Sequence, residues 1–393
     1  MDLTFSPAED AFRTEVRDWL AAHVPDPPLP SGDTAAGFAR HLEWERTLFD
    51  ARYAVVSWPE EFGGRGATLW EWLIFEEEYW LAGAPQRVTQ NGIFLLAPTI
   101  FEFGTPDQQA RILAKMASGE ETWCQGWSEP NAGSDLAGIT SRATRDAGGG
   151  GWRLSGQKTW TTRGAFCTHL FGLFRTDPEA PRHHGLTYLL VDLRQPGVTV
   201  RPVERLDGDD GFAEVFFDDA FVADDMVLGT VDDGWSVAMA TTGSERGLTL
   251  RSPGRFLATA RKLVALARDL DADRAADVDG ATGVDPAMRD RIVRAWIDAE
   301  AYRWQTFWTV TRLVEGGRPG AESSMVKLFW SELDVRLHEL ALELLGPHAE
   351  LVDGELAHWM KGYQFALSGP IYAGTNEIQR NVVAERVLGL PRK

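Results

Sequence analysis

The chain has 393 residues, of which 44% are hydrophobic, and its formal net charge is −19. This length and composition allow two or three domains with a large core. The strong negative charge argues against nucleic acid and anionic membranes as partners. An anionic substrate would therefore need a local cluster of arginines.

The two cysteines, Cys124 and Cys167, are too few for a disulfide framework or a zinc site, and they fit a reducing compartment. The chain opens with Met1-Asp2-Leu3, and no apolar signal segment follows. No uninterrupted apolar run approaches the roughly 18 residues that a membrane span needs. We therefore expect a soluble, cytoplasmic protein without a metal site.

The first 120 residues show the periodicity of helices. Ser6–Glu9 has the sequence of a capping box with proline at the first helical position. Further helices are expected over residues 34–51 and 68–81. Another should begin at Thr105, where the capping pattern is repeated, and run to Ala117. Residues 1–120 are therefore predicted to form an N-terminal helical domain.

The middle of the chain changes to short apolar runs separated by turn residues. This pattern is typical of a small antiparallel sheet or barrel, and we place this central β-domain at residues 121–230. The expected strands cover residues 152–156, 158–162, 185–191, 198–200 and 214–217.

From Gly234 onward the pattern is helical again. The acidic and polar residues Asp271–Asp285 favour a solvated loop between helices. Residues 231–393 are predicted to form a C-terminal four-helix bundle, which makes the whole chain an α+β protein. The four expected helices cover residues 235–270, 286–315, 319–346 and 376–388.

One stretch, Trp123–Thr162, carries the first candidate site. The loop Ser128–Asp135 is rich in small residues and hydroxyls, so a ligand can approach its backbone and its N–H groups can hold an anion. Trp160-Thr161-Thr162 adds an aromatic face and two hydroxyls. Together they suggest a site for a large, flat, phosphate-bearing cofactor. An ordinary hairpin with a glycine-rich turn at Gly148–Gly151 explains the stretch about equally well when it is taken alone.

The C-terminal part holds a second candidate site in two places. Thr241–Gly247 lies at an expected break in a long helix, because glycines and Pro253 disfavour a regular helix there. Ile371–Gln379 reads as an apolar entry, a glycine turn and a helix capped by Asn376. Such a helix start can bind a carbonyl or phosphate oxygen. A surface charge pair at Glu245 and Arg246, and a plain capping loop at the second place, are the simpler alternatives.

Three motifs in this order resemble the acyl-CoA dehydrogenase family: Glu129–Asp135, Gly156–Thr162 and Tyr372–Arg380. The resemblance spans nearly the whole chain and includes its helix–sheet–helix layout. It implies an FAD-dependent enzyme that acts on an acyl-CoA thioester. The FAD contacts implied for this sequence are Gln125, Trp127, Ser128, Gly133, Ser134, Trp160, Thr161, Thr162, Thr375 and Glu377.

The resemblance also assigns roles within the site. Ser128 would bond the pyrimidine edge of the flavin, Trp160 would cover one flavin face, and Thr162 would donate to flavin N5. The Ala373 N–H would polarise the thioester carbonyl. The substrate contacts implied are Ser134, Ser244, Arg246, Ala373 and Gly374.

One departure from the family pattern concerns the catalytic base. Many members carry a glutamate where this chain has Ala373, and alanine cannot remove a proton. In the isovaleryl and long-chain types the base lies on another helix, at the position that aligns with Glu245. The sequence therefore resembles the relocated-base type, with Glu245 removing the α-proton and hydride passing to flavin N5 to give the trans-2-enoyl-CoA. The acyl group stays open.

A second departure concerns the partners. The Arg-x-x-Phe-Gly motif that contacts FAD across subunits in many members is absent from this sequence. The resemblance implies an electron-transferring flavoprotein as electron acceptor and a homo-oligomer, either dimer or tetramer. A heteromeric dehydrogenase subunit is the first alternative, and a flavin oxidase or monooxygenase on the same fold is the second. A cofactor-free interaction protein is the third.

Overall fold

The computed structural model describes residues 4–245, 252–276, 284–317, 320–352 and 354–392. The chain forms two compact units, each assembled from separate stretches of sequence. Unit 1 comprises Met1–Val24, Leu69–Ala84 and Arg246–Lys393, and unit 2 comprises Pro25–Thr68 and Pro85–Glu245. Helices from both ends of the chain therefore belong to unit 1.

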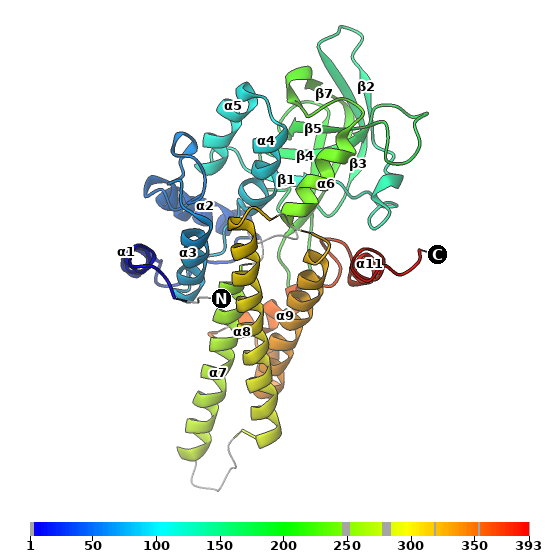
Figure 1. The fold of residues 1–393 in the computed structure, drawn as a ribbon. Coiled ribbons are helices and arrows are strands. Elements are labelled where there is room, and N and C mark those ends of the chain that lie inside the picture. Colours follow the sequence, from blue (N-terminus) through cyan, green and yellow to red (C-terminus); the bar gives the residue numbers. More distant parts are fainter. Residues whose placement is uncertain (1–3, 246–251, 277–283, 318–319, 353, 393) are drawn as a thin grey trace. The chain divides into compact units, whose positions relative to one another are not determined.

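Three long helices run side by side in unit 1 (Figure 1): α7 (Pro253–Ala276), α8 (Pro286–Val314) and α9 (Ser323–Leu345). Both α7 and α8 begin at a proline, a residue that suits the first helical position because no intrahelical N–H bond is lost there. Asp285 caps α8 by accepting from the Ala287 N–H at 3.4 Å. The core between the helices includes Phe256, Trp330 and Leu337.

The predicted four-helix bundle is incomplete, because unit 1 also contains α10 (Ala357–Ala366). This helix was missed because no side chain caps its start and Gly362 interrupts its sequence. It is followed by α11 (Asn376–Val382) and a π-helical turn, η6 (Val383–Val387), which together account for the predicted helix over 376–388.

The predicted loop at Asp271–Asp285 begins too early, because α7 continues to Ala276. The Asp271 carboxylate accepts from the Val284 N–H at 2.5 Å and pairs with Arg289 at 3.0 Å. Asp271 therefore has a structural role, which the acidic composition of this stretch did not indicate. Residues 277–283 lie outside the described part of the chain.

Two further helices of unit 1 come from the start of the sequence: α1 (Pro7–His23) and α3 (Leu69–Leu81). The predicted capping box of α1 is confirmed, since Ser6 and Glu9 each accept from the other's backbone N–H. Glu77 of α3 is buried and pairs with Arg13 of α1 and with Arg303 of α8. A carboxylate in the core thus joins three helices.

Unit 2 surrounds its sheet with short helices, which include the predicted helices over 34–51 and 105–117. No helix in the described part of the chain is long and apolar enough to cross a membrane. The helical elements are α2 (Ala35–Asp50), η1 (Glu60–Phe62), the π-helix η2 (Asn91–Leu96), α4 (Ala97–Phe103), α5 (Pro106–Ala117), η3 (Leu136–Gly138), η4 (Asp224–Met226) and α6 (Gly234–Glu245).

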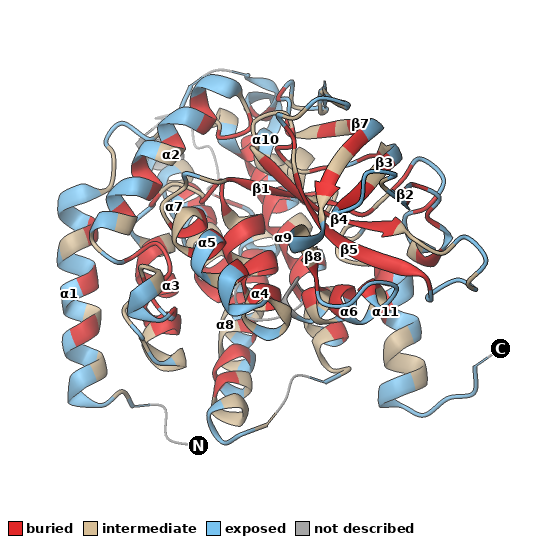
Figure 2. Ribbon diagram, turned by 90° about the horizontal axis from the view of Figure 1, so that it is seen from above, coloured by how far each residue is buried: buried red, intermediate tan, exposed pale blue. Residues whose placement is uncertain are grey.

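The sheet of unit 2 has the strand order β6-β7-β3-β2-β4-β5-β8, with β1 beside β4. Most pairs are antiparallel, but β1 and β2 both run parallel to β4, so the purely antiparallel prediction is wrong. Parallel neighbours are joined by long connections, and local patterns do not reveal them. Figure 2 shows β4 and β5 buried along most of their length. The strands are β1 (Trp123–Gly126), β2 (Arg142–Arg145), β3 (Gly151–Lys158), β4 (His169–Arg175), β5 (Leu186–Asp192), β6 (Val198–Val203), β7 (Phe212–Ala223) and β8 (Val227–Leu228).

The prediction of two strands between residues 152 and 162 is also wrong. A single strand, β3, runs to Lys158, and the chain then leaves the sheet. Trp160 and Arg163 adopt left-handed backbone conformations, with φ of 59° and 55°. L-residues with bulky side chains seldom adopt positive φ, so this turn could not be predicted from the residue types.

Candidate functional site

The loop after β1 forms a compact turn in unit 2. Glu129 and Ala132 exchange backbone hydrogen bonds of 2.9 and 3.0 Å, and Gly133 and Ser134, which follow this turn, are exposed. A Cβ built on Gly133 would meet no atom within 4 Å, so the space beside it is open. A residue without a side chain in open space leaves room for close approach to the backbone.

A buried ion pair holds this loop to the end of β3. The Lys158 ammonium lies 2.8 Å from Glu129 Oε1, and the Lys158 side chain is fully buried. Glu129 Oε2 accepts from the Thr140 N–H at 2.7 Å and Oε1 from the Ser141 N–H at 2.9 Å. The Thr159 N–H adds a direct bond of 2.9 Å to the Ser128 carbonyl. The two candidate segments therefore form one rigid piece.

Both members of this pair are charged at neutral pH. Burial by itself would raise the pKa of Glu129, but the Lys158 charge and the hydrogen bonds that the carboxylate accepts outweigh it and lower the pKa to about 2. Burial lowers the pKa of Lys158 to about 8, although the Glu129 carboxylate acts in the opposite direction. The ammonium also lies 4.9 Å from the ring centre of Phe174, over the ring face.

The Trp160 side chain is 61% exposed although its backbone is strained. A left-handed conformation costs an L-residue about 1–2 kcal/mol. Thr161 secures the turn, because its N–H and hydroxyl both donate to the Ala213 carbonyl, at 3.1 and 2.8 Å. The Phe212 ring supports the indole edge-on, with ring centres 5.7 Å apart. A strained, exposed indole on a fixed turn suits a flat ligand, since such strain clusters at binding sites.

Other predicted residues of unit 2 lie beside these segments. Ser128, Gln125 and Thr162 are half-buried, and Trp127 is buried. The indole N–H of Trp127 has no hydrogen-bond partner within the described residues. A buried orphan donor next to the loop is consistent with a bound group that accepts from it. The hydroxyl of Thr161, in contrast, donates to the Ala213 carbonyl and so stabilises the turn.

The helix α6 is described as far as Glu245. The break predicted within Thr241–Gly247 reaches residues 246–251, which lie outside the described part of the chain. Three hydroxyls meet on its buried side, since Thr241 Oγ1 lies 2.9 Å from Thr99 Oγ1 and 3.3 Å from the Tyr188 hydroxyl. The side chains of Ser244 and Glu245, and the whole of Arg246, lie outside the described part of the chain. The assignment of the catalytic base therefore rests on the sequence.

The turn before α11 is the candidate site of unit 1. Ala373 and Gly374 are both left-handed, with φ of 56° and 78°. Gln379 is fully buried, and its Nε2 donates to the carbonyls of Ala373 and Gly374 at 2.9 and 3.3 Å. The amide thus locks a turn that contains a strained alanine.

The start of α11 differs from the prediction in its capping residue. Thr375 is the N-cap, accepting from the Ile378 N–H at 3.3 Å, so the prediction that Asn376 caps the helix is wrong. Asn376 is buried instead, and its Oδ1 accepts from Lys327 Nζ at 2.7 Å. Glu377 is exposed, and hydrogen bonds from its own N–H and from Thr375 lower its pKa.

Three charged or polar side chains that organise these turns were not predicted: Lys158, Arg163 and Gln379. The partners of Lys158 and Arg163 lie 29 or more residues away in the sequence. Gln379 binds a turn whose shape was not predicted. Lys158 is the last residue of β3 and stands two positions before Trp160, and this placement was the signal available for it.

The fold and these turns define a class of cofactor-binding enzymes. In this class a sheet domain lies between two helical domains along the sequence. Residues 6–120 match the N-terminal domain of acyl-CoA dehydrogenases, residues 124–220 the middle domain, and residues 232–388 the C-terminal domain. The chain belongs to the acyl-CoA dehydrogenase family and is therefore an FAD-dependent oxidoreductase of lipid metabolism.

Named relatives support this assignment along the full length. The chain is 41% identical over 398 residues to acyl-CoA dehydrogenase IpdE1 of Mycobacterium tuberculosis, covering 98% of each chain. It is 41% identical over 404 residues to IpdE1 of Mycolicibacterium smegmatis, covering 97% of this chain and 98% of the relative.

Solved structures share the fold. The Tcur3481-Tcur3483 steroid ACAD superposes with a TM-score of 0.86 at 26% identity, and the ChsE4-ChsE5 complex from Mycobacterium tuberculosis with 0.84 at 26%. Both comparisons cover 100% of this chain and of the solved chain. The predicted three-part α+β fold is confirmed.

Proposed function

We propose that this enzyme converts an acyl-CoA thioester to the trans-2-enoyl-CoA, with Glu245 as the base that removes the α-proton. The observation that carries the proposal is the residue at position 373, where alanine has no group that can accept a proton. The base must then come from another element, and α6 ends on Glu245, at the position where the relocated-base members carry theirs. When bound, FAD supplies the hydride acceptor at N5.

The backbone at Ala373 has a complementary role. Removal of the α-proton places negative charge on the thioester oxygen, and a fixed N–H donor at that oxygen is worth about 3–4 kcal/mol in other enzymes. The lock formed by Gln379 on the carbonyls of Ala373 and Gly374 supports this role, because it holds the backbone in place before substrate binds. Gly374, Ser134, Ser244 and Arg246 complete the proposed substrate contacts.

The proposed FAD contacts are those that the sequence indicated. Trp160 covers one face of the flavin, Thr162 donates to its reactive edge, and Ser128 bonds its pyrimidine edge. The exposed, strained indole and the orphan Trp127 N–H support this placement in unit 2. Gln125, Gly133, Ser134, Thr161, Thr375 and Glu377 form the rest of the proposed contact set.

For the substrate we propose a bulky, ring-bearing acyl group. The solved relatives named as a steroid ACAD support this class. The π-helix η2 also supports it, because π-helical turns recur at functional sites and this one packs against α6 in unit 2. A panel of straight-chain, branched and ring-bearing acyl-CoAs tests the choice directly.

We also propose that the chain acts in the cytoplasm within an oligomer, either as a homo-oligomer or with a second dehydrogenase chain, and passes electrons to an electron-transferring flavoprotein. Large apolar side chains exposed on α8 and α9, namely Val293, Ile297 and Met325, support an assembly. The paired names of the solved relatives favour a heteromeric one. Light scattering of the purified chain, alone and co-expressed with a candidate partner, distinguishes the two.

Domain boundaries near residues 120 and 230 remain a proposal. The gaps between the three matched segments, at 121–123 and 221–231, support them. Limited proteolysis followed by mass spectrometry should place the first cut in the second gap, at the exposed residues Gly229–Val231, because Thr122 and Trp123 in the first gap are buried. A first cut elsewhere would contradict the boundary near residue 230.

The experiment that tests the base is anaerobic bleaching of the flavin by acyl-CoAs, comparing native protein with Glu245→Gln. We expect the native flavin to bleach with at least one thioester, and the variant to keep its FAD and stay yellow. Glu315→Gln, an exposed change at the end of α8, is the matched control and should bleach like the native protein. Equal bleaching by Glu245→Gln would show that the base is another residue.

Two further results would redirect the proposal. If FAD is bound but no thioester bleaches it, the co-expressed complex is tested next. If reduced flavin consumes oxygen rapidly, the enzyme is an oxidase or monooxygenase on the same fold.

A further inference from the structure

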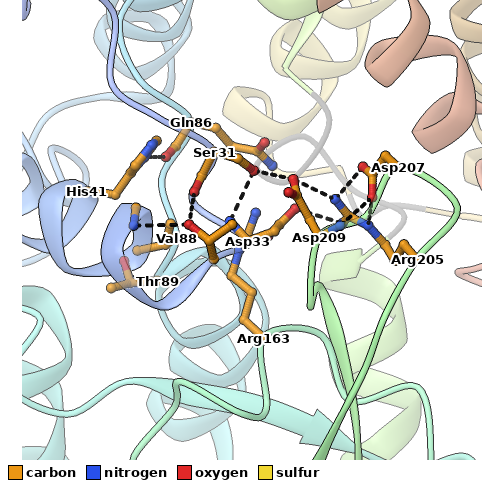
Figure 3. Close-up of polar contacts among 12 residues, drawn as sticks. Ser31, Asp33, His41, Gln86, Val88, Thr89, Arg163, Arg205, Asp207 and Asp209 are labelled. Carbon is orange, nitrogen blue, oxygen red and sulfur yellow. Dashed lines mark hydrogen bonds and ion pairs between the residues drawn. The ribbon is translucent and has the colours of Figure 1, made fainter. Parts of the chain in front are cut away.

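A buried chain of ion pairs in unit 2 joins Asp33 to Arg163 and Arg205 (Figure 3). Arg163 Nε donates to Asp33 Oδ1 at 2.6 Å, and Arg205 donates to Asp33 Oδ2 at 2.7 Å. Each oxygen of the Asp33 carboxylate therefore accepts from a different arginine. Asp33 and Arg163 are both more than nine-tenths buried.

The carboxylate of Asp33 is itself held in place from both sides. Arg205 is fixed by a two-point contact with Asp207, at 2.7 and 3.2 Å. The Asp33 N–H donates to Ser31 Oγ at 3.3 Å, and Ser31 in turn donates to Asp209 at 2.6 Å. The loop before α2 and the β6–β7 loop are therefore locked around one acceptor.

Stability does not explain such a cluster. Burying several charges loses their hydration, and apolar residues of similar volume often fold as well or better. The best-attested use of buried charge is to fix one arrangement among several. The question is which arrangement this cluster fixes.

The backbone of Arg163 indicates which arrangement the cluster fixes. Arg163 is left-handed, its N–H donates to the Gly211 carbonyl at 2.9 Å, and the Gly164 N–H donates back to the Thr161 carbonyl at 3.0 Å. A strained residue keeps its conformation only where its surroundings over-determine it. On the other side of Trp160, the Lys158–Glu129 pair holds the chain in the same way.

We propose that Asp33 and Arg163 are positioning residues for the cofactor: their ion pair fixes the backbone of residues 160–163 and so aims the Trp160 indole and the Thr162 hydroxyl at the flavin. The inference rests on the proposed FAD contacts of Trp160 and Thr162. Neither Asp33 nor Arg163 touches the flavin in this scheme. They act through the turn that they hold.

The test compares Asp33→Asn and Arg163→Lys with Arg194→Lys as matched control. The control changes an exposed arginine of unit 2 whose ion pair, with Asp192, lies outside the Asp33 cluster. Each variant is purified as the full chain, stripped of FAD and reconstituted. The readouts are the FAD dissociation constant, the visible spectrum and midpoint potential of bound flavin, and amide hydrogen exchange of the apoprotein over residues 158–166.

We expect Asp33→Asn and Arg163→Lys to exchange faster over residues 158–166, to bind FAD at least tenfold more weakly and to shift the flavin spectrum. Arg194→Lys should bind FAD within about twofold of the native protein. If Asp33→Asn does not fold, Arg163→Lys, which keeps the charge, decides the question. Restoring part of the affinity with Asp33→Glu in the Arg163→Lys background would support a geometric role.

Two results would overturn the inference. The first is unchanged amide hydrogen exchange over residues 158–166 in the variants, whatever their FAD affinity. The second is native FAD affinity in variants whose only change is a lower stability. A native protein that takes up no FAD would instead overturn the proposed function, and the positioning role would fall with it.

Discussion

Lys158 and Glu129 are 29 residues apart in sequence, yet their charged groups lie 2.8 Å apart in the core of unit 2. Removing one partner leaves the other charge buried without compensation, which costs about 3–5 kcal/mol in other proteins. We therefore expect Lys158→Met to lower the free energy of unfolding by about this amount. Urea denaturation of the apoprotein measures it.

The control for this prediction is a surface pair. Arg291 and Glu343 also form a close ion pair, but both side chains are about half exposed. Exposed pairs contribute little, because water and salt screen them. Arg291→Met should therefore leave the urea midpoint almost unchanged, and an equal loss in the two variants would contradict the special role of the buried pair.

The same pair predicts a loss of stability in acid. The folded pKa of Glu129, about 2, lies below its ordinary value of 4.5, so its contribution is fully present above pH 4.5 and is lost as the pH falls through 2. The difference in urea midpoint between native protein and the double variant Glu129→Gln, Lys158→Met should therefore shrink between pH 4.5 and 2. A difference that stays constant over this range would contradict the assignment.

Trp160 should separate folding from cofactor binding. Glycine adopts positive φ without strain, and the indole is mostly exposed, so Trp160→Gly should leave the apoprotein no less stable. Aromatic stacking is worth about 0.5–1.5 kcal/mol, so FAD affinity should fall by up to about tenfold. Leu206→Gly, at an apolar residue that is even more exposed, is the control and should bind FAD normally. A destabilised variant with native FAD affinity would make Trp160 a packing residue.

Gln379 should affect both stability and turnover. Gln379→Met keeps the side-chain volume but removes the donor to the Ala373 and Gly374 carbonyls. Buried acceptors left without a donor cost about 1–3 kcal/mol. We also expect kcat to fall more than KM rises, since the Ala373 N–H acts mainly on the transition state. Gln305→Met, at an exposed position of α8, should change neither quantity.

Several local signals in the sequence were sufficient. The capping boxes at Ser6 and Thr105 are confirmed, and so are the helices over 34–51 and 68–81. The three motifs, in the loop after β1, at the end of β3 and before α11, led to the correct family.

The sequence was insufficient where distant residues decide the structure. The left-handed residue Arg163 pairs with Asp33, which lies 130 residues earlier in the sequence. The parallel neighbours of β4 and the π-helix η2 have no short-range pattern. The role proposed for Glu245 follows from the resemblance alone, since the side chain lies outside the described residues.

The division of the chain into two units also bears on synthesis at the ribosome. Unit 2 has all its residues once position 245 has emerged, whereas Glu77 of α3 must wait for Arg303, which lies 226 residues later. At about 5–20 residues per second this delay is roughly 10–45 s. During that time Glu77 lacks one of its two arginine partners, so the packing of α1 and α3 in unit 1 is completed only after Arg303 has been synthesised.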